Sequence, residues 1–110
     1  MKALAPTRAS SEDAMPFWVY MVRCADASYY VGVAQLDLEQ RIAEHNAGTY
    51  EGYTFKRRPV QLVWSEEFQR VTDAIGFERQ VKRWSRAKKQ ALIAGNWQRL
   101  KELARSRSRP

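Results

Sequence analysis

Cysteine is almost missing from this sequence of 110 residues, in which Cys24 is the only one. An intramolecular disulfide is therefore impossible, and zinc sites built on several cysteines are excluded. Long apolar runs are missing as well, since no stretch approaches the roughly 20 residues that a membrane-spanning helix needs. Residues 1–15 contain Lys2 and Arg8 but no apolar segment, so we expect no secretory signal there. Together these absences predict a reduced, cytoplasmic setting.

Several kinds of catalytic site are missing too. The sequence has no Gly-rich loop that would cradle phosphates, no paired carboxylates, and no pattern that indicates Ser/His/Asp or Cys/His catalysis. The polar residues left for a site are tyrosines, arginines, one histidine and one glutamate within a basic segment. Taken together, these residue types suit chemistry on the phosphates of a polyanion.

Positive charge is concentrated near the C-terminus. The chain carries 19 Lys and Arg against 12 Asp and Glu, a net charge of +7. Residues 1–78 hold 8 basic against 11 acidic residues, a net charge of −3, whereas residues 79–110 hold 11 basic residues against Glu102 alone, a net charge of +10. Such asymmetry is typical of proteins that bind nucleic acid. A solvated C-terminal helix that only adds solubility is the alternative that charge alone leaves open.

The chain is long enough for one domain, and its four Trp, five Tyr and four Phe indicate a globular one. Alternation of apolar residues predicts a central strand over Phe17–Arg23, with apolar side chains on both faces. Small and polar residues at 26–28 predict a turn that leads into a second strand over Tyr29–Val33, so the two strands form a hairpin. A third strand is predicted over Val60–Phe68.

Helix caps mark four further elements. The predicted helices, each with its capping residue, are Leu38–Ala47 after Asp37, Asp73–Trp84 after Thr72, Arg86–Ala94 after Ser85 and Trp97–Ala104 after Asn96. The order β-β-α-β-α-α-α predicts an α+β fold, with a small three-stranded mixed β-sheet, made of the hairpin plus one crossover strand, flanked by helices. Composition divides the chain into a mobile tail over 1–15, a folded domain over 16–95, and a basic C-terminal helix and tail over 96–110.

Tyr20 and Tyr30 stand on the two arms of the hairpin, so both phenols could face one groove. Taken singly, each reads as an ordinary strand aromatic. Gly32, two residues after Tyr30, favours a functional interpretation, because a missing side chain lets a ligand or another backbone come close.

Arg41 and His45 follow at a spacing of four residues, on one face of the first predicted helix. Arg41 is a planar cation suited to a phosphate oxygen, although an isolated helix arginine is more often only solvated. His45, the only histidine, suits proton transfer or phosphate binding, or else a place at the C-terminal end of the helix dipole.

Glu78 begins the basic region and is its only acidic residue before Glu102. It follows Phe77 on the flank of the predicted apolar helix stripe. One carboxylate, completed by water and substrate phosphate, is sufficient for Mg²⁺. The alternative is a surface ion pair with Lys82, four residues later, which stabilises a helix by only a few tenths of a kcal/mol.

These residues, in this order, resemble the GIY-YIG endonuclease superfamily, in particular its small stand-alone bacterial members. The resemblance covers about Phe17 to Ile93. The first motif corresponds to Trp18-Val19-Tyr20, in which Trp18 replaces the usual glycine, and the second to Tyr30-Val31-Gly32. The other matching elements are Arg41, His45 within the Arg41–Asn46 segment, Glu78, and the Trp84–Lys89 run with Ala91–Ile93.

The resemblance implies a nuclease that hydrolyses DNA phosphodiester bonds at one divalent ion, Mg²⁺ or Mn²⁺. It implies that Tyr20 takes a proton from the attacking water while Tyr30 assists by hydrogen bonding. It further implies that Arg41 holds the scissile phosphate, that His45 aids proton transfer or phosphate binding, and that Glu78 holds the metal.

The sequence thus predicts a structure-selective or weakly sequence-specific DNA endonuclease in repair or recombination. A non-catalytic module on the same fold that binds DNA or RNA is the alternative. We expect the five site residues to converge on one groove. Residues predicted to contact the nucleic acid are Lys56, Arg57, Arg58, Lys82, Arg83, Arg86, Lys88 and Lys89.

Overall fold

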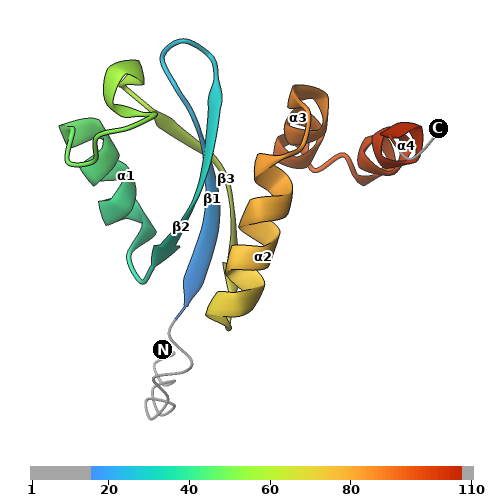
Figure 1. Ribbon diagram of the computed structural model, residues 1–110, viewed down its shortest axis with the longest axis horizontal. Helices are drawn as coiled ribbons and strands as arrows, with labels where there is room; N and C mark the ends of the chain where they lie inside the picture. The colour runs from blue at the N-terminus through green and yellow to red at the C-terminus, as the bar shows by residue number, and fades with distance from the viewer. Residues whose placement is uncertain (1–15, 108–110) are drawn as a thin grey trace.

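The computed structural model of the chain describes residues 16–107, so the predicted tail over 1–15 lies outside the described residues. The described elements follow the predicted order β-β-α-β-α-α-α, with one short 3₁₀ helix added (Figure 1). Their bounds are β1 Phe17–Arg23, β2 Tyr29–Gln35, α1 Leu38–Ala47, η3 Phe55–Arg57, β3 Gln61–Phe68, α2 Val71–Lys82, α3 Arg86–Ala94 and α4 Trp97–Arg107. No helix within 16–107 has the length and apolar character to cross a lipid bilayer.

The sheet has the strand order β2-β1-β3, and both neighbouring pairs are antiparallel. The α+β class and the three strands are confirmed, but the prediction of a mixed sheet is wrong. The connection through α1 does return β3 in the direction of β2. However, β3 lies on the far side of β1, so the two parallel strands are not neighbours.

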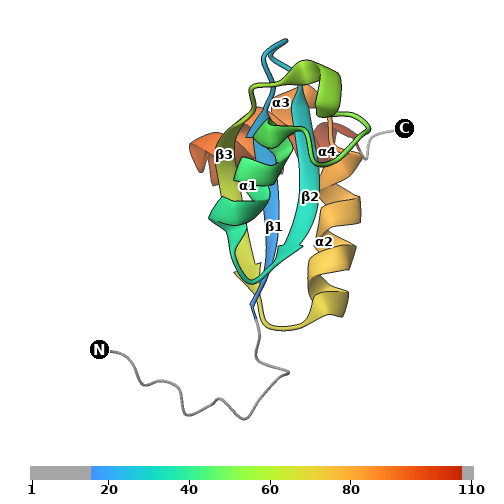
Figure 2. The same cartoon turned by 90° about the vertical axis from the view of Figure 1, so that its left-hand side faces the viewer.

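The central strand β1 supplies two cores, one on each face of the sheet. Val19 and Met21 belong to the core beneath α2 and α3, whereas Tyr20 and Val22 belong to the core beneath α1. The figures show α1 and α2 on opposite sides of the sheet (Figures 1 and 2). Alternation along one strand therefore separates packing residues from residues that can serve a site.

The caps of α1 and α3 are those predicted. Asp37 and Ser85 accept hydrogen bonds from the third residue after each cap, at 3.1 and 3.2 Å, and both helices end at a left-handed glycine, Gly48 and Gly95. Helix α2 differs from the prediction. It begins at Val71 because the Arg70 carbonyl accepts the first helical bond from Ala74, so Thr72 lies inside the helix.

Other ends differ from the predictions by two or three residues. The helix α2 stops at Lys82, since the amides of Arg83 and Trp84 bond three residues back and tighten the last turn. Strand β2 continues to Gln35 instead of ending at Val33. Helix α4 runs to Arg107, three residues beyond the predicted end at Ala104, and 108–110 lie outside the described residues.

A close contact across the hairpin joins the two tyrosine-bearing strands. Tyr20 pairs with Gly32, and a Cβ atom added at Gly32 would lie 2.6 Å from Tyr20 Oη and 2.8 Å from Cζ. The space that the sequence suggested for a ligand or a backbone is therefore filled by the Tyr20 phenol.

We predict that Gly32→Ala lowers the free energy of unfolding by about 1–3 kcal/mol, because the buried Tyr20 ring must shift to make room. Gly76→Ala is the matched control. Nothing lies within 4 Å of a Cβ at Gly76, in the exposed face of α2, so the control should gain up to about 1 kcal/mol. Urea unfolding measures both changes, and a Gly32→Ala protein as stable as the parent would contradict the contact.

Candidate active site

Four of the five predicted site residues line one hollow on the α1 side of the sheet. Tyr20 and Tyr30 come from β1 and β2, and Arg41 and His45 from α1. The hollow has a volume of about 240 Å³, and the loop before η3 closes it. The remaining lining residues are Val33, Tyr50, Glu51, Tyr53 and Thr54.

Tyr20 is 1% exposed, and its hydroxyl lies 2.7 Å from Nε2 of His45. Burial raises the pKa of Tyr20 to about 12, although the nearby Arg41 acts in the opposite direction. At neutral pH the phenol is therefore protonated and can accept a second proton only if it passes its own onward.

His45 is buried between Tyr20 and the loop. Its Nδ1 lies 2.9 Å from Oγ1 of Thr54, so both ring nitrogens have partners. Burial lowers the pKa of His45 below its ordinary value, and the charge of Arg41 lowers it further. The ring is thus neutral. Two tautomers satisfy both contacts: with the proton on Nδ1, His45 donates to Thr54 and accepts from Tyr20, and with the proton on Nε2 both directions reverse.

Arg41 is held by backbone and side-chain contacts at the rim of the hollow. Its guanidinium donates to the Val33 carbonyl at 3.0 Å, and its Nε lies 3.8 Å from a Glu44 oxygen. The Tyr50 hydroxyl donates to the same carboxylate at 2.6 Å, and the Tyr50 ring centroid lies 5.3 Å from the guanidinium carbon. Arg41 is therefore oriented before any ligand binds, instead of moving freely in solvent.

Tyr30 lies against Tyr53, a residue of the loop before η3. The Tyr53 ring stacks on it at 5.9 Å between centroids, with 23° between the planes. Arg57 positions this loop: its guanidinium carbon lies 3.9 Å from the Tyr53 ring centroid, and its Nε lies 3.1 Å from Asp26 in the hairpin turn. Sequence reasoning missed Tyr50, Tyr53 and Thr54, because the loop has no period that signals which side chains turn inward.

Glu78 does not line the hollow. It lies on α2, on the other face of the sheet, where its side chain is 13% exposed and pairs with Lys82 at 2.9 Å. The ion pair that the sequence left as an alternative is therefore present. The Lys82 ammonium also lies 5.5 Å from the Tyr30 ring centroid, past the open edge of β2, and so connects Glu78 to the tyrosine side of the site.

The donor set for a metal ion is sparse. Within residues 16–107 no three side chains of the histidine, cysteine, aspartate or glutamate type come together as a metal site. Glu78 is the one predicted ligand. A single carboxylate fits Mg²⁺, which retains waters and takes phosphate oxygens from its substrate. The residues present therefore fit a metal that binds together with substrate better than a metal held by the protein alone.

The predicted nucleic-acid contacts divide between separate surfaces. Lys82, Arg86 and Lys89 lie close enough for their charges to interact, and burial together with the two neighbouring cations lowers the pKa of Lys89. The Arg86 guanidinium carbon lies 4.6 Å from the Tyr29 ring centroid, next to Tyr30. These three residues form a basic surface beside the hollow.

Arg83 and Lys88 line a different hollow, of about 360 Å³, between α2 and α3. Lys88 is buried, with its ammonium 4.4 Å from the Trp84 ring centroid. Its side chain therefore packs on Trp84 within this hollow, apart from the surface beside Tyr30. Lys56 and Arg58 line a third hollow, on the outer side of η3.

Comparison with known proteins assigns the family. Residues 16–91 match the family of the GIY-YIG catalytic domain. The chain is 46% identical over 77 residues to a UPF0213 protein of Staphylococcus saprophyticus, which covers 70% of this chain and 93% of the relative. A UPF0213 protein of Halobacterium salinarum is 43% identical over 75 residues, 68% of this chain and 96% of the relative.

A solved structure is also similar to this chain in sequence and fold. The solution NMR structure of protein EF2693 from E. faecalis has a TM-score of 0.52 and 33% sequence identity, and it covers 73% of this chain and 84% of that chain. The region 16–91 that matches the family includes both tyrosine motifs, α1 and α2. The resemblance read from the motifs is confirmed: this chain belongs to the GIY-YIG family, among its small stand-alone UPF0213 members.

Proposed function

We propose that this protein is a metal-dependent DNA endonuclease that acts on the structure of its substrate more than on its sequence, in repair or recombination in the cytoplasm. The GIY-YIG domain is a nuclease domain, and it implies a nucleic-acid substrate. The observation that carries the proposal is the hydrogen-bonded chain from Tyr20 through His45 to Thr54 beside Arg41, within one open hollow.

In the proposed mechanism Tyr20 and His45 act as one proton acceptor. As the Tyr20 oxygen takes a proton from the attacking water, its own proton passes to Nε2 of His45, 2.7 Å away. The neutral state of His45 supports this role, because an imidazolium could not accept it. In the tautomer that the transfer needs, Nδ1 of His45 carries the proton and donates a hydrogen bond to Oγ1 of Thr54, 2.9 Å away.

Arg41 binds the scissile phosphate. Its contacts with Val33 and Glu44 orient the guanidinium before the substrate arrives, so less conformational entropy is lost on binding. Tyr30, which stacks on Tyr53 in the lining of the hollow, donates a hydrogen bond to the phosphate or to the attacking water.

Glu78 is the residue that would hold Mg²⁺ or Mn²⁺. When bound, such an ion stabilises negative charge on the phosphate and promotes loss of a proton from water. Lys82, whose ammonium now pairs with Glu78, would be released toward the DNA phosphates.

The pH dependence of cleavage tests the proton relay. Because the pKa of His45 is lowered below 6.5, we expect a rate that stays level between about pH 8 and about pH 6.5 and falls only below that, as His45 gains a proton. Tyr20→Phe should reduce cleavage by about 100-fold or more at every pH. A parent rate that rises tenfold per pH unit toward the Tyr20 pKa of about 12 would instead identify the phenolate itself as the base.

Glu78→Gln separates cleavage from binding. It keeps the side-chain shape and removes one negative charge, so the protein should fold, bind DNA equally or slightly more tightly, and cleave about 100-fold more slowly or worse, about 2.7 kcal/mol in barrier. Glu102→Gln is the matched control, since Glu102 also pairs with a basic residue on an exposed helix face. Undiminished cleavage in Glu78→Gln, or equal cleavage by the parent in EDTA, would contradict the metal-dependent nuclease. A parent that binds DNA without cleaving it would favour the alternative, a module that only binds nucleic acid.

The salt dependence of DNA binding tests the basic surface beside the hollow. If Arg86 and Lys89 each neutralise a phosphate, the double change to Ala should lower the slope of log K against log salt by about 1.8 for duplex DNA. Arg99→Ala, on α4 and paired with Glu102, should leave the slope unchanged. An unchanged slope in the double variant would mean that this surface is only solvated.

A further inference from the structure

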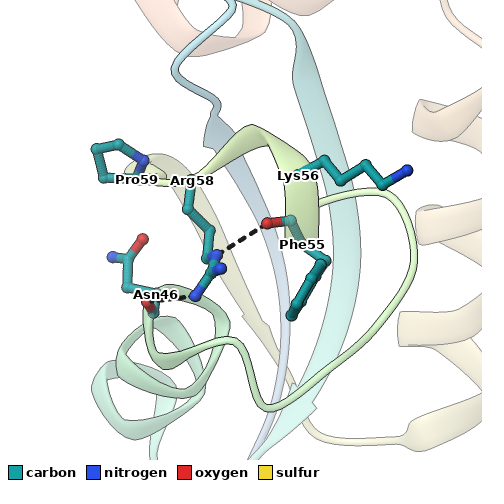
Figure 3. A pocket seen from close by; sticks show the side chains of 5 residues that line it. All are labelled: Asn46, Phe55, Lys56, Arg58 and Pro59. Carbon is teal, nitrogen blue, oxygen red and sulfur yellow. Dashed lines mark hydrogen bonds between the residues drawn. The ribbon is translucent and has the colours of Figure 1, made fainter.

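The third hollow lies on the outer side of η3, at the C-terminal end of α1 (Figure 3). Its volume is about 610 Å³, within the range of about 300–1,000 Å³ that is common for small-molecule sites. Asn46, Phe55, Lys56, Arg58 and Pro59 line it. The nuclease mechanism uses none of these residues.

Phe55 and Arg58 form a preassembled surface in this hollow, with the guanidinium over the ring. The guanidinium carbon of Arg58 lies 4.6 Å from the Phe55 ring centroid. Arg58 donates from Nε to the Phe55 carbonyl at 2.8 Å and from a terminal nitrogen to the Asn46 carbonyl at 3.4 Å, and Figure 3 shows the side chain stretched between them. Phe55 is 37% exposed, so part of its ring is open to a ligand.

The wall opposite this surface is also rigid. The Asn46 side chain donates to the Val60 carbonyl at 3.0 Å and accepts from the Val60 amide at 2.7 Å. This pair of bonds ties the end of α1 to the segment before β3. The hollow is therefore held open by hydrogen bonds on both sides.

The charge of the hollow is positive. Lys56 and Arg58 line it, and no carboxylate does. Lys56 makes no hydrogen bond or ion pair within the described part of the chain, and Figure 3 shows its ammonium extended outward from the ribbon. The hollow thus combines an exposed aromatic ring with cations, which is how proteins bind single-stranded nucleic acid.

The hollow adjoins the candidate active site through two pairs of consecutive residues. His45 and Thr54 line the site, and their neighbours Asn46 and Phe55 line the third hollow. The two hollows are therefore neighbours along the end of α1 and the start of η3.

We propose that this hollow binds an unpaired nucleobase of the substrate strand, stacked on the Phe55–Arg58 surface, with adjoining phosphates at Lys56 and Arg58. In a duplex both faces of a base are covered by its neighbours, so a protein ring can stack only on a base that has left the helix. The inference rests on the proposed function for the identity of the strand, and it adds the class of substrate: DNA with unpaired nucleotides beside the scissile phosphate.

The test measures binding and needs no cleavage. The full chain in EDTA is titrated into two labelled single strands of equal length and charge, one of thymidine nucleotides and one of abasic nucleotides, and fluorescence anisotropy reports the affinity. The parent should bind the thymidine strand about tenfold more tightly, because only that strand can stack. Phe55→Leu, which keeps an apolar side chain but removes the ring, should bind both strands alike.

Two further variants complete the design. Phe55→Tyr retains a ring and should restore the preference, which excludes a loss of fold as the cause. Trp97→Leu removes another aromatic side chain, 60% exposed on α4, and should leave the preference unchanged. A parent that binds the two strands equally, or a Phe55→Leu variant that keeps the preference, would overturn the nucleobase site. Neither result would affect cleavage or its dependence on Glu78, so failure of this inference is distinguishable from failure of the proposed function.

Discussion

The site depends on the contacts that the Tyr20 phenol makes with Gly32 and His45. The phenol lies over Gly32 of the neighbouring strand and ends at His45 of α1, which in turn meets Thr54 of the loop. One side chain therefore fixes the spacing between β1, β2, α1 and the loop before η3. Any larger side chain at Gly32 would push the ring out of line with His45. The lack of a side chain at Gly32 is thus needed both for packing of the Tyr20 ring and for its hydrogen bond to His45.

Burial sets the protonation states of this contact. An enclosed phenol and an enclosed imidazole both disfavour their charged forms, so Tyr20 and His45 are neutral together. Neither group alone is a good base at neutral pH. As a hydrogen-bonded pair they can move a proton without leaving a charge on the buried phenol. Arg41 adds a fixed positive charge at the rim, where a phosphate would compensate it.

The two faces of the sheet divide the tasks of the molecule. The α1 face carries the tyrosines, the arginine and the histidine, and the η3 segment beside them carries Phe55 and Arg58. The α2 face carries the larger apolar core, with Glu78 and Lys82 at its margin. Lys82 connects the two faces. Because β2 is an edge strand, the Lys82 side chain extends from α2 past this strand, and its ammonium lies near the Tyr30 ring.

The sequence by itself determined the strands, the capped helices and the family. Alternation and cap residues are local signals, so β1, α1 and α3 have the predicted bounds, and the order of Tyr20, Tyr30, Arg41 and His45 identified the fold. Only the tertiary structure decided which partners these residues meet. The antiparallel neighbours of β1 and the inward turn of Thr54 and Tyr53 depend on segments far apart in the chain. No periodic pattern records such contacts, because they arise from how the loop and the sheet edges close in space.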